Sequence, residues 1–277
     1  MRVPRGSRPG RPRRPARESL RRGIYLLPSL FTVGNMLCGF ASIMHALHTR
    51  LELAGWLILL AGVLDGLDGR IARLTRSTSE FGKEYDSLAD VVSFGIAPAF
   101  LAYQWALEGV GRWGWAAAFL FLVAGSVRLA RFNVKAGHTD RRFFVGLPIP
   151  GGAGALTLMV LVGMDLDLPV TRVVAIAASL FVFVVAVLMV STIPYRSFKE
   201  FNLRQRWPAT AFFLFAVIVA VLAFSPLPAM AFLLGAYLLG GPAEMVLRKL
   251  RRKPATAAQP GTLQVTSAHT PTNPDHP

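Results

Sequence analysis

The sequence predicts an all-α, polytopic membrane protein with about eight transmembrane helices. Hydrophobic residues make up 53% of the 277 residues. The fraction becomes roughly 60% when glycine is counted and tyrosine is left out, whereas soluble domains lie near 45–50%. Apolar stretches also recur along the chain, and most approach the ~20 residues that a helix needs to cross a bilayer. They lie at residues 26–47, 52–66, 88–107, 112–130, 146–164, 169–190, 209–224 and 227–247.

These stretches read as helices because membrane β-strands would alternate polar and apolar residues with a period of two. The second stretch has only about 13 residues before Asp65, so we expect a short helix or one that enters a polar cavity. Arg76 to Ser79 offers a helix stop and an N-cap, which predicts a hairpin between the second and third stretches. Pro148 and Pro150 suit a helix start at the fifth stretch.

Three segments follow from this pattern. Residues 1–22, rich in Arg and Pro, and residues 251–277, rich in Thr, Pro and Ala, are expected to be disordered tails. Residues 23–250 form the expected transmembrane domain, and no cleavable signal peptide is evident. The single cysteine, Cys38, excludes a disulfide framework and a cysteine-ligated zinc site.

The net charge of +15 favours anionic lipids and phosphate-bearing substrates as partners. Nucleic-acid-binding proteins can be as basic, but they lack repeated apolar runs of helix-spanning length, so no nucleic acid is expected. Of the 30 Lys and Arg residues, all except Arg50, Arg112 and Arg172 fall on the side that holds both tails. By the positive-inside rule, both termini are predicted to be cytoplasmic.

Acidic residues cluster at the predicted cytoplasmic ends of the second and third helices. Asp65 and Asp68 are three residues apart and share one helix face, and Asp86 and Asp90, four apart, share a face of the next helix. Four converging carboxylates repel one another unless a cation lies between them. Oxygen ligands suit Mg²⁺ or Mn²⁺, and four carboxylates can hold two such ions. Helix capping would explain one or two of these acids, but not two aligned pairs.

Small residues and one arginine are interleaved with the carboxylates. Gly69, Ala72 and Gly82 leave room for a bulky ligand to approach the backbone, and Arg73 supplies a charge for a phosphate. This combination indicates a metal-bound phosphoanhydride as the ligand.

The spacing of these residues resembles the signature of the CDP-alcohol phosphotransferases, which are membrane enzymes of phospholipid synthesis. The match covers eight positions, Asp65-x₂-Asp68-Gly69-x₂-Ala72-Arg73-x₈-Gly82-x₃-Asp86-x₃-Asp90. Further stretches, among them Arg128-Leu-Ala-Arg-Phe-Asn133 and Gly146-Leu-Pro-Ile-Pro150, resemble the bacterial enzymes of this family that use serine as the acceptor. The resemblance covers roughly residues 24–200.

This resemblance implies a reaction and roles for the matched residues. The phosphatidyl group of CDP-diacylglycerol would pass to the hydroxyl of L-serine by direct in-line attack, releasing CMP. Metal ligands would be Asp65, Asp68, Asp86 and Asp90, with Asp90 also the general base, and the cytidine diphosphate would meet Gly69, Ala72, Arg73 and Gly82. A bacterial cytoplasmic membrane location, an active site facing the cytoplasm and a homodimer are also implied.

Other polar residues are candidates for the substrate sites. Thr32 and Asn35, three apart in the first apolar stretch, either line the cytidine diphosphate cavity or hydrogen-bond a neighbouring helix. The candidates for serine binding are Arg128, Arg131, Asn133 and Lys199. A guanidinium can hold a carboxylate by two hydrogen bonds, but the same arginines and the lysine can equally be ordinary inside-positive anchors.

Two alternative functions stay open at this point. An enzyme of the same family could use glycerol 3-phosphate or inositol phosphate, which would demand further Lys or Arg beside the carboxylates. A cation transporter would also contain intramembrane acids, but transporter sites tend to lie near the bilayer midplane in repeated folds. In this sequence the acids lie at helix ends and no internal repeat is found.

Overall fold

The computed structural model describes residues 16–75, 79–135, 143–196 and 209–251. Apart from two three-residue strands, the regular structure in these ranges is helical. The elements are α1 (Ala16–Leu47), α2 (Leu51–Thr75), α3 (Glu80–Asp90), the π-helix η1 (Val91–Ile96), α4 (Ala97–Trp105), the 3₁₀-helix η2 (Leu107–Val110), α5 (Arg112–Lys135), β1 (Phe143–Val145), α6 (Ile149–Asp165), α7 (Arg172–Val190), β2 (Pro194–Arg196), α8 (Ala209–Phe224) and α9 (Pro226–Arg251).

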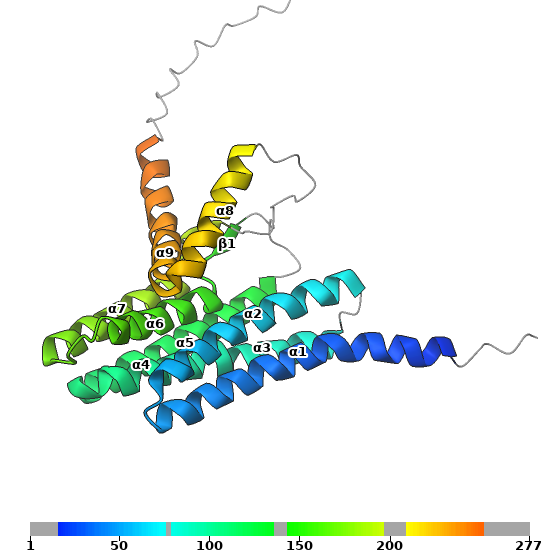
Figure 1. Cartoon of the computed structure of the whole chain (residues 1–277), viewed down its shortest axis with the longest axis horizontal. Coiled ribbons are helices and arrows are strands. Elements are labelled where there is room, and N and C mark those ends of the chain that lie inside the picture. Colours follow the sequence, from blue (N-terminus) through cyan, green and yellow to red (C-terminus); the bar gives the residue numbers. More distant parts are fainter. Residues whose placement is uncertain (1–15, 76–78, 136–142, 197–208, 252–277) are drawn as a thin grey trace, which may run out of the picture.

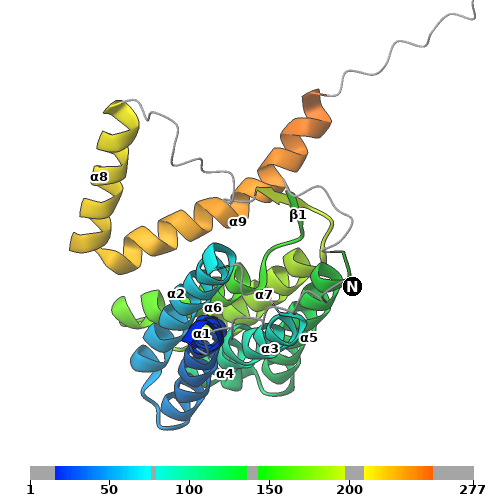
Figure 2. The same cartoon turned by 90° about the vertical axis from the view of Figure 1, so that its right-hand side faces the viewer.

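Helices α1 to α7 lie side by side in one elongated bundle (Figure 1). Viewed along the bundle, α1 and α2 form one side, while α3, α5 and α7 lie toward the other (Figure 2). Helices α8 and α9 lie outside this bundle and at an angle to it in both views. The catalytic candidates of the sequence therefore fall in the α1–α7 bundle, whereas α9 reaches it from outside.

Several helix ends carry the residues that the sequence places there. Ser79 is the N-cap of α3, and its Oγ accepts a hydrogen bond from the Gly82 N–H at 2.9 Å, which confirms the predicted cap. Pro148 is the N-cap of α6, with Pro150 in its first turn, as the Pro pattern predicts. Helix α1 begins at Ala16, inside the segment expected to be a tail.

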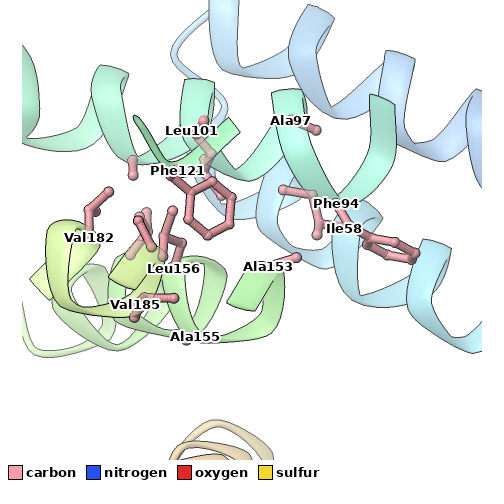
Figure 3. Packing of buried hydrophobic residues seen from close by; sticks show 14 of the residues in the cluster. Ile58, Phe94, Ala97, Leu101, Phe121, Ala153, Ala155, Leu156, Val182 and Val185 are labelled. Carbon is pink, nitrogen blue, oxygen red and sulfur yellow. The ribbon is translucent and has the colours of Figure 1, made fainter. Parts of the chain in front are cut away.

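The core of the bundle is apolar and closely packed. Phe121 of α5 and Leu101 of α4 pack with Leu156 of α6, and all three are fully buried (Figure 3). Ile58 and Phe94 join this cluster from α2 and η1. This packing joins α2, η1 and α4 to α5 and α6, so the ends of these helices have fixed relative positions.

The helices have the composition of a helical membrane protein. Four helical segments in the described residues are long and apolar enough to cross a membrane, namely Leu30–Leu47, Arg112–Val134, Arg172–Val190 and Pro226–Met245. Helix α6 is apolar but shorter. Each of the eight apolar stretches expected from the sequence overlaps helical structure, but the expectation that all eight cross the membrane goes beyond these four.

A short antiparallel strand pair was not predicted. Strand β1 pairs with β2 so that Phe144 lies opposite Tyr195. Gly146 follows β1 with a φ of +82°, a conformation that favours glycine, and its N–H donates to the Ile193 carbonyl at 2.9 Å. The pair ties the start of α6 to the segment that follows α7. Three-residue strands carry too little periodicity to be recognised in a sequence of this kind.

Candidate active site

Helices α2 and α3 bring the predicted carboxylates together. One oxygen from each of Asp65, Asp68 and Asp86 lies within 4.8 Å of the others. The Asp90 carboxyl group lies within hydrogen-bonding reach of Asp65, and that of Asp68 within reach of Asp86. Asp68 and Asp90 are buried, with 5% and 8% of their surface exposed. The two aligned pairs expected from the sequence therefore form one cluster.

Helix α1 supplies a hydrogen bond to each side of this cluster. Thr32 Oγ1 donates to Asp68 Oδ2 at 3.1 Å, and Asn35 Nδ2 donates to Asp90 Oδ1 at 3.5 Å. Thr32 and Asn35 are three residues apart, so they lie on the same face of α1, and both are buried. Of the two expectations for these residues, hydrogen bonding to neighbouring helices is the one that the structure displays.

Asp90 is the last residue of α3, directly before the π-helix η1. In η1, Ser93 Oγ donates to the Asn35 backbone carbonyl at 2.9 Å, so the same asparagine is held through both its backbone and its side chain. Gly39 packs directly against Ser93, and a side chain at Gly39 would collide with it. π-Helical turns are rare and often occur at functional sites. The close α1–η1 contact fixes Asp90 relative to α1.

The electrostatics of the cluster call for a cation. The pKa of Asp86 is raised to about 7, first because burial disfavours its charged form and then because Asp68 and Asp65 are also negative. Asp86 Oδ1 is buried and has no hydrogen-bond partner among the described residues. A divalent cation would relieve this repulsion and would satisfy that oxygen, and an all-carboxylate set suits Mg²⁺ or Mn²⁺. The residues present therefore fit the metal site that the sequence predicts.

Open space adjoins the cluster on α2. A Cβ built at Gly66 or Gly69 would meet nothing within 4 Å, so a ligand can approach the α2 backbone there. Gly82 is placed differently, because a Cβ there would lie 3.0 Å from Ser79 Oγ at the N-cap of α3. Ala72 and Arg73 belong to α2, but their side chains lie outside the described residues.

Of the three candidates for serine binding that lie in the described residues, Arg128 is the buried one. Its side chain is buried, with 7% of the residue exposed, and its guanidinium stacks over the Phe132 ring at 5.3 Å from the centroid. It is also close enough to Asp90 to interact with it electrostatically. A buried guanidinium near the carboxylates is placed to receive an anionic group.

The remaining serine candidates have other surroundings. Arg131 is exposed, and its Nη1 donates to the carbonyl of Val190, the last residue of α7, at 3.0 Å. Asn133 is also exposed and donates to Ser87 Oγ on α3 at 2.8 Å. These bonds connect α5 to α7 and to α3. Lys199 lies outside the described residues.

Sequence reasoning did not single out Ser87, Ser93 or Tyr237. Ser93 is a polar residue within an apolar run, which is a usable sign of a side chain that faces the bundle interior. Ser87 lies between Asp86 and Asp90 and is visible only as part of that motif. Tyr237 lies in α9 and its ring packs against that of Tyr195, with the centroids 5.5 Å apart, but no local pattern distinguishes it from an interfacial tyrosine.

A helical membrane bundle that contains a partly buried cluster of carboxylates, with open backbone beside it and a buried arginine, is the arrangement expected of a membrane enzyme that binds metal-bound phosphates. Comparison with known families agrees with this class. The family model described as CDP-alcohol phosphatidyltransferase matches residues 25–185, which include all four aspartates. The chain therefore belongs to the CDP-alcohol phosphatidyltransferase family.

Curated relatives extend the similarity along most of the chain. A Helicobacter pylori protein named CDP-diacylglycerol–serine O-phosphatidyltransferase is 39% identical over 218 residues, covering 79% of this chain and 90% of the relative. A protein of the same name from Mycobacterium leprae is 44% identical, over 47% of this chain and 45% of its own length. Another from Bacillus subtilis is 36% identical, over 45% of this chain and 69% of its own length.

Proposed function

We propose that this chain transfers the phosphatidyl group from CDP-diacylglycerol to the hydroxyl of L-serine, giving phosphatidylserine and CMP. The observation that carries this proposal is the cluster of Asp65, Asp68 and Asp86, with Asp90 beside it, in a chain of this family. The names of the relatives support serine as the acceptor.

Asp90 would act as the general base. A serine hydroxyl is a weak nucleophile and needs a proton acceptor within hydrogen-bonding reach as the new O–P bond forms. The hydrogen bond from Asn35 holds the Asp90 carboxylate in one orientation, and the α1–η1 packing restricts its movement. The proton of the serine hydroxyl would pass to Asp90 while the phosphatidyl group is transferred and CMP leaves.

Asp65, Asp68 and Asp86, with Asp90, would hold two divalent ions, Mg²⁺ or Mn²⁺. When bound, these ions polarise phosphoryl oxygens and neutralise the charge on the departing CMP. Thr32 would orient Asp68 for this role. The open face of α2 at Gly69, together with Ala72, Arg73 and Gly82, would receive the cytidine diphosphate group.

The acceptor would bind next to Asp90, with its carboxylate on Arg128. The burial of Arg128 and its electrostatic interaction with Asp90 support this assignment. Arg131 and Asn133, which are hydrogen-bonded to Val190 and Ser87, would hold α5 in place beside the site. Lys199 is kept as a further candidate contact of the serine carboxylate.

The setting of the reaction is also proposed from the sequence. The distribution of Lys and Arg supports cytoplasmic termini, eight spans, contacts with anionic lipids and an active site that faces the cytoplasm of a bacterial inner membrane. Residues 1–22 and 251–277, into which α1 and α9 extend as far as Ala16 and Arg251, would be tails of a single transmembrane domain, and the enzyme would form a homodimer.

The deciding experiment measures release of CMP from CDP-diacylglycerol by the purified full chain in mixed micelles. L-serine, glycerol 3-phosphate and inositol phosphate are compared as acceptors, each with Mg²⁺, Mn²⁺ or EDTA. We expect release that depends on serine and on a divalent ion, and its loss in Asp65→Asn. Asp165→Asn, which removes an exposed carboxylate of α6, is the matched control and should retain activity. Release with another acceptor but not with serine would overturn the assignment.

A further inference from the structure

The π-helix η1 is held on three sides by three consecutive buried residues. Ser93 bonds to α1, and Phe94 packs in the hydrophobic core. Gly95 lies against α5, where a Cβ would come within 2.9 Å of the Leu122 side chain. Helix α3, by contrast, is exposed or half-buried until its last two residues. The position of Asp90, the last residue of α3, therefore depends on how η1 is packed.

Gly39 allows Ser93 to reach the backbone of α1. Ser93 Oγ donates to the Asn35 carbonyl at 2.9 Å. Within α1 this carbonyl faces the residue four positions later, which is Gly39, so a side chain there would stand next to the bond. A Cβ at Gly39 would lie 2.7 Å from Ser93 Cα, closer than Cβ atoms come to other atoms in proteins. The hydrogen bond from Ser93 therefore requires a glycine at position 39.

Asn35 transmits this contact to the proposed base. Its Nδ2 donates to Asp90 Oδ1 at 3.5 Å, beyond the usual 2.7–3.2 Å, so a small movement of η1 away from α1 would break the bond. Asn35 is fully buried, and its Oδ1 has no hydrogen-bond partner among the described residues. No second side-chain bond therefore holds the amide, and its place relative to Asp90 depends on the backbone that Ser93 contacts.

We propose that Ser93 is a positioning residue for Asp90 that acts through Asn35, and that Gly39 makes its contact possible. The hydrogen bond from Ser93 sets the separation of η1 and α1, and this separation sets the distance between the Asn35 amide and the Asp90 carboxylate. The inference rests on the proposed function, because it takes Asp90 as the base. It predicts a loss of rate without a loss of substrate binding, since the orientation of the base changes and no substrate contact is removed.

Ser93→Ala removes the hydroxyl and no other group. We expect kcat to fall about 3- to 10-fold, with the KM for serine and the KM for CDP-diacylglycerol within about twofold of wild type. Ser42→Ala is the matched control. Ser42 is also fully buried, and its Oγ donates to a backbone carbonyl of a neighbouring helix, that of Ala54, at the same 2.9 Å. Both variants should lose a similar amount of stability, measured as Tm, but only Ser93→Ala should lose rate.

Gly39→Ala tests the same contact from α1. We expect kcat to fall about 10- to 100-fold, because the added Cβ forces η1 away from α1. Adding Ser93→Ala should not restore the rate, because the collision with Ser93 Cα remains. Gly34→Ala is the control on the same helix and should keep the wild-type kcat. A Cβ at Gly34 would meet only the Leu64 side chain, at 3.4 Å, which is an ordinary van der Waals contact.

A double-mutant cycle separates positioning from a merely structural role. If Ser93 acts through Asn35, Ser93→Ala should change kcat by less than about twofold when Asn35→Ala is already present. Independent, multiplying effects would overturn the inference, as would an unchanged kcat in Ser93→Ala or an equal loss of rate in Ser42→Ala. Wild-type protein that releases CMP with another acceptor but not with serine would instead overturn the proposed function, and kcat with that acceptor would then decide the role of Ser93.

Discussion

Asn35 of α1 donates a hydrogen bond from Nδ2 to Asp90 Oδ1 over 3.5 Å, although the two residues are 55 positions apart in the sequence. One turn earlier on the same helix face, Thr32 makes the corresponding bond to Asp68. Helix α1 supplies none of the four carboxylates, but these two bonds connect it to α2 and α3, which supply them. Since Asn35 contacts the proposed base and Thr32 a proposed metal ligand, the two residues allow the two roles to be tested separately.

We expect Asn35→Ala to lower kcat about 10-fold, because a base that is free to rotate spends less time within reach of the serine hydroxyl. The KM for CDP-diacylglycerol should stay within about threefold of wild type, since the Asn35 amide donates its hydrogen bond to Asp90, the proposed base. Steady-state titration of both substrates measures the two constants. A rise in the KM for CDP-diacylglycerol with kcat unchanged would instead favour a role of Asn35 in cytidine diphosphate binding.

Thr32→Val keeps the size of the side chain and removes the hydroxyl that donates to Asp68. We expect the concentration of Mg²⁺ that gives half-maximal activity to rise about 10-fold, the lower end of the range for losing a partner that orients a metal ligand. The rate at saturating Mg²⁺ should recover to nearly that of wild type. Ser126→Ala, which removes a half-buried hydroxyl that donates to the Leu122 carbonyl within α5, is the control and should not change the Mg²⁺ requirement.

Asp90→Asn preserves shape but cannot accept a proton. We expect kcat to fall by about 10²- to 10⁴-fold, the usual contribution of general base catalysis, while binding of CDP-diacylglycerol survives better than the rate. Equilibrium binding of the donor and single-turnover release of CMP distinguish the two quantities. Turnover within a few-fold of wild type would mean that another group is the base.

Metal ions and protons should compete at the cluster. The pKa of Asp86 is about 7 in the folded, metal-free protein, against 3.8 for an unperturbed aspartate. A carboxyl group whose pKa is higher in the folded state than in the unfolded state stabilises the fold at pH values below its unfolded-state pKa. This contribution is lost as the pH rises through its folded-state pKa. The metal-free protein should therefore lose stability from this group between about pH 4 and 7.

Binding of Mg²⁺ should restore this loss, because the cation replaces the proton. We expect the rise in Tm on adding Mg²⁺ to be larger at pH 8 than at pH 5.5, measured by thermal unfolding in detergent micelles. Asp86→Asn should reduce the difference between the two pH values. A rise in Tm that is the same at both pH values would contradict this account of the cluster.

The cluster itself could be predicted from the sequence because its information is local. Asp65 and Asp68 share a helix face by spacing alone, and Ser79 predicts the turn that brings Asp86 back toward them. By contrast, the bonds from Thr32 and Asn35 depend on which neighbour α1 packs against. The spacing of the two residues showed that they share a face, but not which helices that face meets.

The acceptor side was less predictable for the same physical reason. Arg128 and Arg131 are equivalent in the sequence, three residues apart in a basic segment. Their difference arises from tertiary packing, because α5 buries Arg128 and leaves Arg131 exposed at the end of α7.

This difference between the two arginines gives the last prediction. Arg128→Lys keeps the positive charge but loses the planar pair of donors that holds a carboxylate at two points. Losing a charge-assisted hydrogen bond costs about 1.5–3 kcal/mol, so we expect the KM for serine to rise roughly 10- to 150-fold. The KM for CDP-diacylglycerol should stay within about threefold.

Arg131→Lys is the matched control, since it makes the same change one helical turn away. Its partner is a backbone carbonyl of α7, which a lysine ammonium can also contact, so the KM for serine should remain within about twofold of wild type. Titrating both substrates on each variant in mixed micelles measures the contrast. A general loss of packing or charge would affect a buried and an exposed arginine alike. Equal effects of the two substitutions would therefore assign both arginines to anchoring and would remove Arg128 from the acceptor site.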